Sequence, residues 1–226
     1  MGHRKKTRRH YMPEILKIDP SHPDMALITE AVRIMKAGGV IAYPTETFYG
    51  LGADGKNERA VEKVFLIKER DFKNPISLII GDRIDLIGLV DEITDTAHRL
   101  MEEFWPGGLT LIFTASPDIP PRLTGGTGKI GIRISSHPIA NLLTKTFSRP
   151  ITATSANLSG EGECSSAGEV IQRLGNHIDA VIDGGPTQGK SGTTILDVSV
   201  HPPVILREGI IPTALIQDTL RRMNIS

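Results

Sequence analysis

The feature that most constrains this chain is the stretch from Gly38 to Gly52, which reads GGVIAYPTETFYGLG. It begins as an apolar strand, breaks at Pro44 and continues into the polar residues 45–47. In open α/β sheets, ligands bind where the carboxyl ends of strands open into such polar groups. Gly50 and Gly52 allow a positive φ or a close approach of backbone to a ligand. The alternative is a strand followed by an ordinary turn, since glycine and proline punctuate most loops.

The remaining chain alternates helical and strand patterns. Apolar residues three to four positions apart predict helices, and short apolar runs predict strands. The predicted helices are 24–36, 57–68, 92–104, 138–147, 166–174 and 213–223, and the predicted strands are 15–18, 40–43, 77–80, 109–113, 130–134, 151–155, 178–182, 194–198 and 204–207. The segment 117–128 is rich in proline and glycine and is expected to wrap the surface. Without an internal repeat or a long linker, the pattern predicts one α/β domain whose twisted sheet mixes parallel and antiparallel strands between flanking helices.

The formal charge is zero, with 26 basic and 26 acidic residues, but the charges are unevenly distributed. Five cations lie between Arg4 and Arg9, and no acidic residue precedes Glu14. The rest of the chain keeps 21 basic against 26 acidic residues and is therefore acidic. We expect residues 1–12 to form a disordered basic tail and residues 13–226 to form the folded domain. The other interpretation of the tail is an arm that adds affinity for a polyanion.

Cys164 is the single cysteine, so the chain cannot form an internal disulfide. No window of about 18 apolar residues is present, and the N-terminus lacks the apolar segment of a signal peptide. These observations predict a cytoplasmic protein without a membrane span. The histidines are scattered without metal-ligand spacing, so we expect no metal site built from protein groups.

Several polar groups follow the predicted strands and the second helix. Thr45 follows the opening strand, Arg133 lies near the end of 130–134, and Ser155 and Asn157 end 151–155. A mixed sheet can gather these groups into one cleft. Lys68 and Arg70 lie at the end of a helix, where they either complement the helix dipole or form a two-cation clamp on phosphate. The glycine-rich loop 183–194 lacks the GxxxxGK[ST] spacing of a P-loop and could equally be a mobile connection.

Taken together, the motifs resemble the YrdC-like family of threonylcarbamoyl-AMP synthases. The matching pieces appear in family order: YPTETFYGLG at 43–52, KER at 68–70 with Asn74-Pro75, WPGGLT at 105–110, GIRI at 131–134, SANLSG at 155–160 and LREG at 206–209. The resemblance implies a YrdC-like fold, similar to double-stranded-RNA-binding proteins, with a deep, positively lined cleft. It does not extend to the additional C-terminal domain of the longer family form.

The resemblance also implies a reaction and roles for individual residues. Such enzymes combine L-threonine, bicarbonate and ATP into threonylcarbamoyladenylate and release pyrophosphate, and a partner enzyme transfers the threonylcarbamoyl group to tRNA. Mg²⁺ would arrive with ATP. The catalytic pair implied is Lys68 and Arg70. The implied threonine-binding residues are Thr45, Arg133 and Thr193, and the implied nucleotide-binding residues are Lys68, Arg70, Ser155, Asn157 and Arg207.

The sequence departs from the family pattern close to these residues. Asp71 stands where proline is common, and Thr193-Thr194 stands where Ser-Thr is common. A family branch of poorly defined activity lacks the Lys-x-Arg and Ser-x-Asn pieces, and this chain keeps both.

Two other functions are consistent with parts of the pattern. One is a non-catalytic protein that binds tRNA or double-stranded RNA through the tail and a cationic cleft. The other is the carbamoyl-adenylate-forming domain of hydrogenase maturation factors. Those domains belong to much larger chains with zinc-finger-like cysteines, and the lone Cys164 argues against this function.

Overall fold

The computed structural model describes residues 12–223, which form ten strands, seven α-helices and two short 3₁₀ helices. The predicted tail therefore lies almost entirely outside the described residues. The strands are β1 (Glu14–Lys17), β2 (Ile41–Pro44), β3 (Tyr49–Gly52), β4 (Ser77–Ile79), β5 (Leu109–Thr114), β6 (Lys129–Arg133), β7 (Ile151–Ser155), β8 (Ala180–Asp183), β9 (Thr194–Asp197) and β10 (Val204–Arg207). The helices are α1 (Met25–Lys36), α2 (Glu58–Lys68), α3 (Asp95–Phe104), α4 (Pro121–Thr124), α5 (Pro138–Phe147), α6 (Ala167–Leu174) and α7 (Thr213–Met223), with 3₁₀ turns η1 (Arg83–Leu86) and η2 (Gly175–His177).

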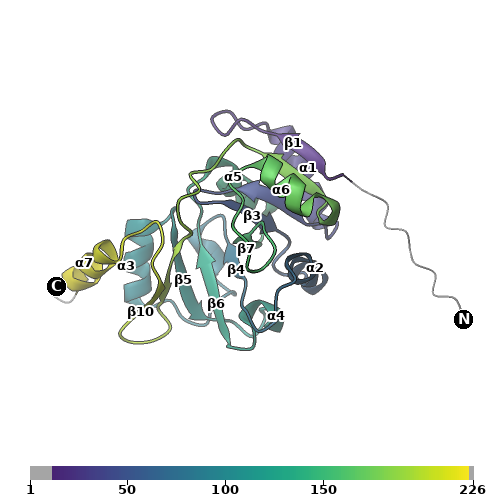
Figure 1. Cartoon of the computed structure of the whole chain (residues 1–226). Helices are drawn as coiled ribbons and strands as arrows, with labels where there is room; N and C mark the ends of the chain where they lie inside the picture. Colours follow the sequence, from purple (N-terminus) through teal and green to yellow (C-terminus); the bar gives the residue numbers. More distant parts are fainter. Residues whose placement is uncertain (1–11, 224–226) are drawn as a thin grey trace, which may run out of the picture.

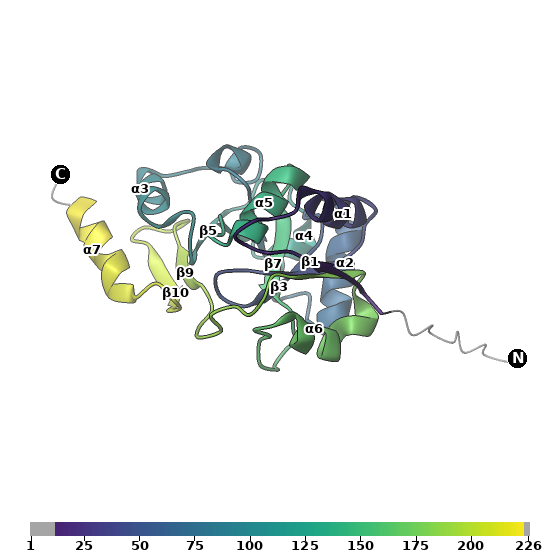
Figure 2. The same cartoon turned by 90° about the horizontal axis from the view of Figure 1, so that it is seen from above.

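The strands form one sheet in the order β1-β8-β2-β3-β7-β4-β6-β5-β9-β10. Four neighbouring pairs are parallel, namely β1 with β8, β8 with β2, β4 with β6, and β5 with β9. The other neighbours are antiparallel. The predicted single-domain α/β fold with a mixed sheet is therefore confirmed. Figures 1 and 2 show α3, α7 and β10 gathered at one end of the molecule, and α1, α2 and α6 at the other.

Helices cover both faces of the sheet, as its side chains require. Along β2 and the residue before it, Val40 and Ala42 join one apolar cluster, whereas Ile41 and Tyr43 join the other, because successive side chains of an extended chain point to opposite faces. Helices α1 and α5 supply the second cluster, and α2, α3 and α6 contribute to the first. Side chains of Asp24, Asn57 and Ser166 accept hydrogen bonds from the first turns of α1, α2 and α6, which fixes where these helices begin.

The second half of the opening stretch differs from the prediction. Residues 49–52 form strand β3, which pairs with β2 in an antiparallel hairpin. Neither Gly50 nor Gly52 has a left-handed φ. Instead, both lie against the ring of Tyr43: a Cβ on Gly52 would be 2.9 Å from Tyr43 Cε1, and one on Gly50 would be 3.3 Å from Tyr43 Cζ. These glycines therefore make room for a buried tyrosine, which accounts for the family-like YGLG sequence in terms of packing.

Smaller differences concern segments with weak sequence signals. The surface segment 117–128 contains the single helical turn α4, which packs beside α2. Helix α3 begins at Asp95, after its N-cap Thr94, and not at residue 92. Among residues 12–223, no helix is long and apolar enough to cross a membrane.

Candidate functional site

Side chains from both halves of the chain line one cavity of about 220 Å³. The lining includes six of the predicted site residues: Thr45, Arg70, Arg133, Ser155, Thr193 and Arg207. They come from the β2–β3 turn, the segment after α2, β6, β7, the segment before β9, and β10. Lys68 and Asn157 are not part of the lining, although both were predicted to bind nucleotide.

The predicted site residues do not all lie at the same edge of the sheet, as the carboxyl ends of parallel strands would. Strand β7 is antiparallel to β4, whereas β6 is parallel to β4, so Arg133 and Ser155 end strands that run in opposite directions. Both nevertheless contact the same cavity. Strands β6 and β7 lie on either side of the short strand β4, so only one strand separates the two residues.

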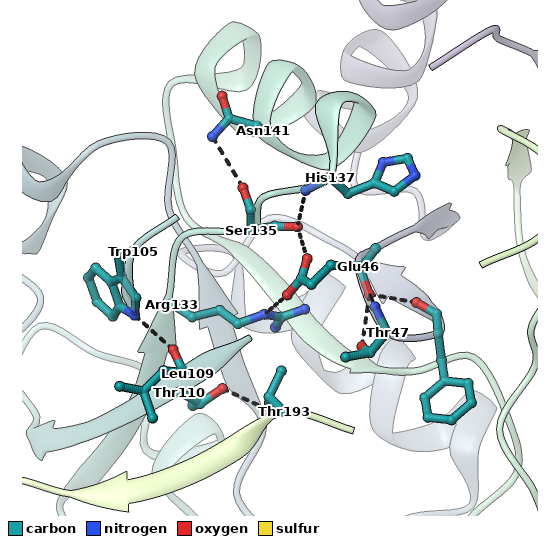
Figure 3. Close-up of polar contacts among 12 residues, drawn as sticks. Glu46, Thr47, Trp105, Leu109, Thr110, Arg133, Ser135, His137, Asn141 and Thr193 are labelled. Atoms are coloured by element: carbon teal, nitrogen blue, oxygen red, sulfur yellow. Dashed lines mark hydrogen bonds and ion pairs between the residues drawn. The ribbon is translucent and has the colours of Figure 1, made fainter. Parts of the chain in front are cut away.

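Arg133 is held by an ion pair inside the site. Its Nε donates to Glu46 Oε1 at 3.0 Å, and the hydroxyl of Ser135 donates to Glu46 Oε2 (Figure 3). The Arg133 and Glu46 side chains are only 7% and 10% exposed. Within the described residues, the Nη atoms of Arg133 make no hydrogen bond to protein. Every buried side-chain polar atom of the described residues has a hydrogen-bond partner, so the Nη atoms are not buried. The Nη atoms therefore keep access to the cavity that Arg133 lines.

The charge on Glu46 is preserved by its neighbours. Burial raises the pKa of the Glu46 carboxyl, but the Arg133 guanidinium and the Ser135 hydroxyl more than offset burial, so the net pKa lies below the ordinary value. His137 lies beside this network: its backbone N–H donates to Ser135 Oγ at 3.2 Å, and burial lowers the pKa of its imidazole. At neutral pH the network therefore contains one carboxylate facing one guanidinium.

The hydroxyl of Thr45 is largely used in shaping its own turn. It donates to Phe48 O at 2.7 Å, it accepts from the backbone N–H of Thr47 at 3.2 Å, and the Thr47 hydroxyl lies 3.0 Å from it. Because the Thr45 proton is committed to Phe48, the Thr47 hydroxyl is the donor of that contact, and both lone pairs of Thr45 Oγ1 are occupied. Thr45 therefore binds a ligand only if one of its hydrogen bonds to Thr47 is released.

Thr193 and Arg207 form a second wall. The Thr193 and Thr110 hydroxyls lie 2.9 Å apart (Figure 3). Nε and Nη2 of Arg207 donate to Thr193 O at 3.1 and 2.8 Å, which fixes the guanidinium. Gly209, the last residue of the LREG motif, packs against residues 192–193, since a Cβ on Gly209 would collide with Gly192 O. Arg207 thus anchors the glycine-rich loop while lining the cavity.

Lys68 and Arg70 separate at the end of α2. Glu69 adopts a left-handed conformation with φ 50°, and the N–H of Arg70 donates to Phe65 O at 3.0 Å, as in a helix C-cap that reverses the chain. The Arg70 guanidinium then donates to Asn74 O at 3.1 Å and Pro75 O at 2.9 Å, and lines the cavity. The turn therefore sends the two cations in different directions.

Lys68 is 1% exposed and points toward the residues after β7. Its ammonium donates to Ser155 O at 2.5 Å, Asn157 O at 2.8 Å and Asn157 Oδ1 at 2.9 Å. Burial lowers the pKa of Lys68 to about 8, with a smaller contribution from Arg70. Three acceptors match the three hydrogens of an ammonium group.

The charge of the cavity lining is strongly positive. Arg70, Arg133 and Arg207 line it, and Glu163 is the acidic residue in the lining. No group of three or more histidine, cysteine, aspartate or glutamate side chains within residues 12–223 could hold a metal ion. Three guanidinium groups around one cavity favour a ligand with several negative charges.

Sequence reasoning gave no role to several residues that shape this site. Glu46 lies inside the opening motif, and Ser135 lies two residues after Arg133, but their contact spans 89 positions of sequence. Thr110 and Glu163 also line the cavity. Of these two, Thr110 had a signal in the sequence, because it ends the WPGGLT motif, whereas Glu163 had none. Trp105 in the same motif donates from Nε1 to Leu109 O at 2.7 Å and so has a structural role (Figure 3).

Known proteins resemble this chain over most of its length. The sequence model of the Sua5_yciO_yrdC family, described as telomere recombination, matches residues 33–209. The threonylcarbamoyl-AMP synthase of Bacillus subtilis is 38% identical over 205 residues, which cover 90% of this chain and 58% of that relative. The threonylcarbamoyl-AMP synthase of Photobacterium profundum is 35% identical over 184 residues, covering 80% of this chain and 98% of the relative.

Solved structures extend the likeness to the fold. Sua5 of P. abyssi complexed with L-threonine superposes with a TM-score of 0.88 at 36% identity, covering 91% of this chain and 60% of that one. E. coli YciO gives a TM-score of 0.82 at 32% identity, covering 89% and 98%. The chain thus spans less than two thirds of the B. subtilis and P. abyssi relatives, and it matches nearly the full length of the P. profundum relative and of YciO. With a family model matched over most of the chain and with these identities, the chain belongs to the Sua5/YciO/YrdC family.

Proposed function

We propose that this chain synthesises L-threonylcarbamoyladenylate from L-threonine, bicarbonate and ATP. The amino group of threonine and bicarbonate give a carbamate with loss of one water molecule, and a carbamate oxygen attacks the α-phosphorus of ATP. The new P–O bond forms as the bond to the β-phosphate oxygen breaks, and pyrophosphate leaves with its electron pair. The product would supply an enzyme that transfers the threonylcarbamoyl group to tRNA.

The observation that carries the proposal is the convergence of Arg70, Arg133 and Arg207 on one cavity. A carbamate, a carboxylate and a triphosphate must share one site, and fixed cations reduce the repulsion between them. Little covalent chemistry is required of the protein, because positioning and charge stabilisation suffice for attack at phosphorus. The relatives named threonylcarbamoyl-AMP synthase and the relative complexed with L-threonine support this assignment.

The residues divide into two sets of proposed contacts, one to threonine and one to ATP. The free Nη atoms of Arg133 would bind the threonine carboxylate in a bidentate manner, and Thr45 would contact the amino acid by releasing a hydrogen bond from Thr47. Thr193, which is held beside Arg207, would also contact the amino acid. Arg70 and Arg207 would bind phosphate oxygens, and Ser155 would contact the nucleotide. Each of these residues lines the cavity.

Mg²⁺ would enter with ATP. The lining offers the Glu163 carboxylate together with threonine and serine hydroxyls. This donor set fits a Mg²⁺ that is held mainly by substrate phosphates and water, since Mg²⁺ dehydrates reluctantly. When bound, the ion would neutralise charge on the triphosphate, and the arginines would position the remaining oxygens.

The proposal is tested with the full chain, ATP, Mg²⁺, bicarbonate and labelled threonine. We expect threonine-dependent release of pyrophosphate and a labelled adenylate. Arg133→Ala should remove the dependence on threonine, and Arg99→Ala should not, because Arg99 is an exposed partner of Glu102. Absence of threonine-dependent pyrophosphate from the unmodified chain would refute the proposal.

A further inference from the structure

The Lys68 ammonium has no hydrogen left for a ligand in this structure. Its three hydrogens match three acceptors: the backbone oxygens of Ser155 and Asn157 and the side-chain oxygen of Asn157, at 2.5, 2.8 and 2.9 Å. The side chain is 1% exposed and does not line the cavity. A contact from Lys68 to phosphate would require at least one of these bonds to break inside a buried environment, which is costly.

The amide of Asn157 is fixed in one orientation by its two neighbours. Its Oδ1 accepts from Lys68, and its Nδ2 donates to Glu161 O at 2.6 Å. The flipped orientation would place the NH₂ group against an ammonium and the amide oxygen against a carbonyl, and both contacts would be repulsive. Because Lys68 offers only donors, it determines which end of the amide faces β7.

The same amide oxygen of Asn157 is hydrogen-bonded to Ser155, a residue of the cavity lining. The Ser155 hydroxyl donates to Asn157 Oδ1 at 2.5 Å, and Ser155 lines the cavity. The hydroxyl proton is therefore committed to Asn157, which does not line the cavity, and the lone pairs of Ser155 Oγ remain as acceptors. The chain of contacts runs from Lys68 through Asn157 to Ser155 and ends at the ligand space.

We infer that Lys68 is a positioning residue, which acts on the ligand through the turn 155–157 and leaves direct contact with anions to Arg70. The kinetic test of this inference rests on the proposed function, because it measures kcat/KM for ATP. It assigns Ser155 Oγ the role of a hydrogen-bond acceptor, so this wall binds a donor on the ligand, such as a hydroxyl, an amino group or magnesium-bound water. Arg70, whose guanidinium is held by the carbonyls of Asn74 and Pro75, is independent of this turn.

The test is a double-mutant cycle of Lys68→Met and Asn157→Ala in the full chain, with kcat/KM for ATP as the readout. If Lys68 acts through Asn157, each single substitution should lower kcat/KM by about tenfold or more. The kcat/KM of the double variant should lie within about threefold of that of the more impaired single variant, because substitutions within one network do not have additive effects. Multiplication of the two losses would overturn the inference. Arg70→Ala combined with Asn157→Ala provides the contrast, and these losses should multiply.

Two further variants separate positioning from charge. Lys68→Arg keeps the positive charge, but a planar guanidinium cannot direct three hydrogens to these three oxygens, so it should lose as much as Lys68→Met. Retention of ATP affinity by Lys68→Arg would contradict the inference. Lys63→Met is the matched control on the same helix. Lys63 is exposed and also donates to a carbonyl, Gly38 O at 2.6 Å, and its loss should leave activity unchanged.

A readout without ligand keeps this inference separate from the proposed function. The side-chain amide protons of Asn157 should exchange slowly with solvent in the unmodified chain and at least about tenfold faster in Lys68→Met, measured by NMR in samples that melt cooperatively. Unchanged protection would overturn the inference. If the unmodified chain releases no pyrophosphate, the proposed function fails, and the exchange experiment still decides the role of Lys68.

Discussion

Glu46 Oε1 accepts a hydrogen bond from Arg133 Nε at 3.0 Å, and the Nη atoms of Arg133, a residue of the cavity lining, make no hydrogen bond to the described protein. The carboxylate thus fixes the plane of the guanidinium without competing for its two Nη atoms. Ser135 holds the other carboxylate oxygen. This arrangement gives the cavity a bidentate donor of fixed orientation, which a flexible arginine could not provide at the same entropic cost.

Glu46→Gln should weaken threonine binding and lower stability together. The change leaves Arg133 buried without its counter-charge, and breaking such a pair costs on the order of 3 kcal/mol of unfolding free energy. We expect a raised KM for threonine with a smaller change in kcat, since the guanidinium remains but loses its orientation. Urea unfolding and steady-state kinetics measure both effects. Glu102→Gln, which removes an exposed ion pair, should cost less than about 1 kcal/mol and is the control.

Arg70→Ala should remove turnover with little loss of stability. Arg70 is half-buried, and its hydrogen bonds go to the exposed segment 74–75, so its removal should cost about 1 kcal/mol or less. Loss of a guanidinium that we propose to bind phosphate should weaken ATP binding by at least about tenfold. Calorimetric titration with ATP and a thermal melt of the same sample give both values. A strongly lowered melting temperature with intact ATP binding would show that Arg70 is structural.

Gly52→Ala should destabilise the fold by about 1–3 kcal/mol, because the new Cβ would lie 2.9 Å from the Tyr43 ring. That ring cannot easily retreat: it is buried, and its hydroxyl donates to Thr152 O at 3.0 Å. Denaturant midpoints provide the measurement. Gly162→Ala is the control, since no atom lies within 4 Å of its Cβ position, and it should change stability by less than about 0.5 kcal/mol. Equal effects of the two changes would contradict the packing role of Gly52.

The stability of the fold should rise between pH 8 and pH 10.5 through Lys68. Burial lowers the pKa of Lys68 in the folded protein to about 8 from its ordinary 10.5, so in this window the unfolded chain binds more protons than the folded one. Stability therefore increases with pH, by on the order of 3 kcal/mol across the whole window. Urea unfolding at pH 7.5 and pH 10 measures the rise, and Lys68→Met should lack it. Parallel pH profiles for the two proteins would show that the ammonium carries no such penalty.

Local signals were sufficient for most elements of the fold. Helices α5 and α7 begin and end at the predicted residues, because apolar periodicity and the proline at position 138 act within a few residues. Strand β3 was not predicted, because the two glycines in Tyr-Gly-Leu-Gly resemble a turn unless the ring of Tyr43 is known to lie on them. The single turn α4 is too short to produce a periodic pattern.

For the cavity, the sequence indicated lining residues better than the groups behind them. Thr45, Arg133 and Ser155, which all line the cavity, were predicted because each lies at or near the end of a recognisable strand. Glu46 received no role because its partner lies 87 positions away, and no local pattern reports such a distance. The three-acceptor environment of Lys68 was equally invisible, since its partners are 87 and 89 positions away. A resemblance to a family can assign a role to a residue, but it does not show which neighbouring groups that residue contacts.

The order of strands in the sheet has a consequence for how this protein forms during synthesis. Within the described chain, strand β1 pairs only with β8, so Glu14 can pair with its partner Ala180 only after Ala180 has been synthesised. At ribosomal speeds, the time between the synthesis of these two residues is roughly ten to thirty seconds. The cavity is completed later still, by Thr193 and Arg207. Chains released before β8 would therefore carry an unpaired β1, and chains released before residue 207 would carry an unfinished binding site. The cavity is thus complete only when almost the whole described chain has emerged.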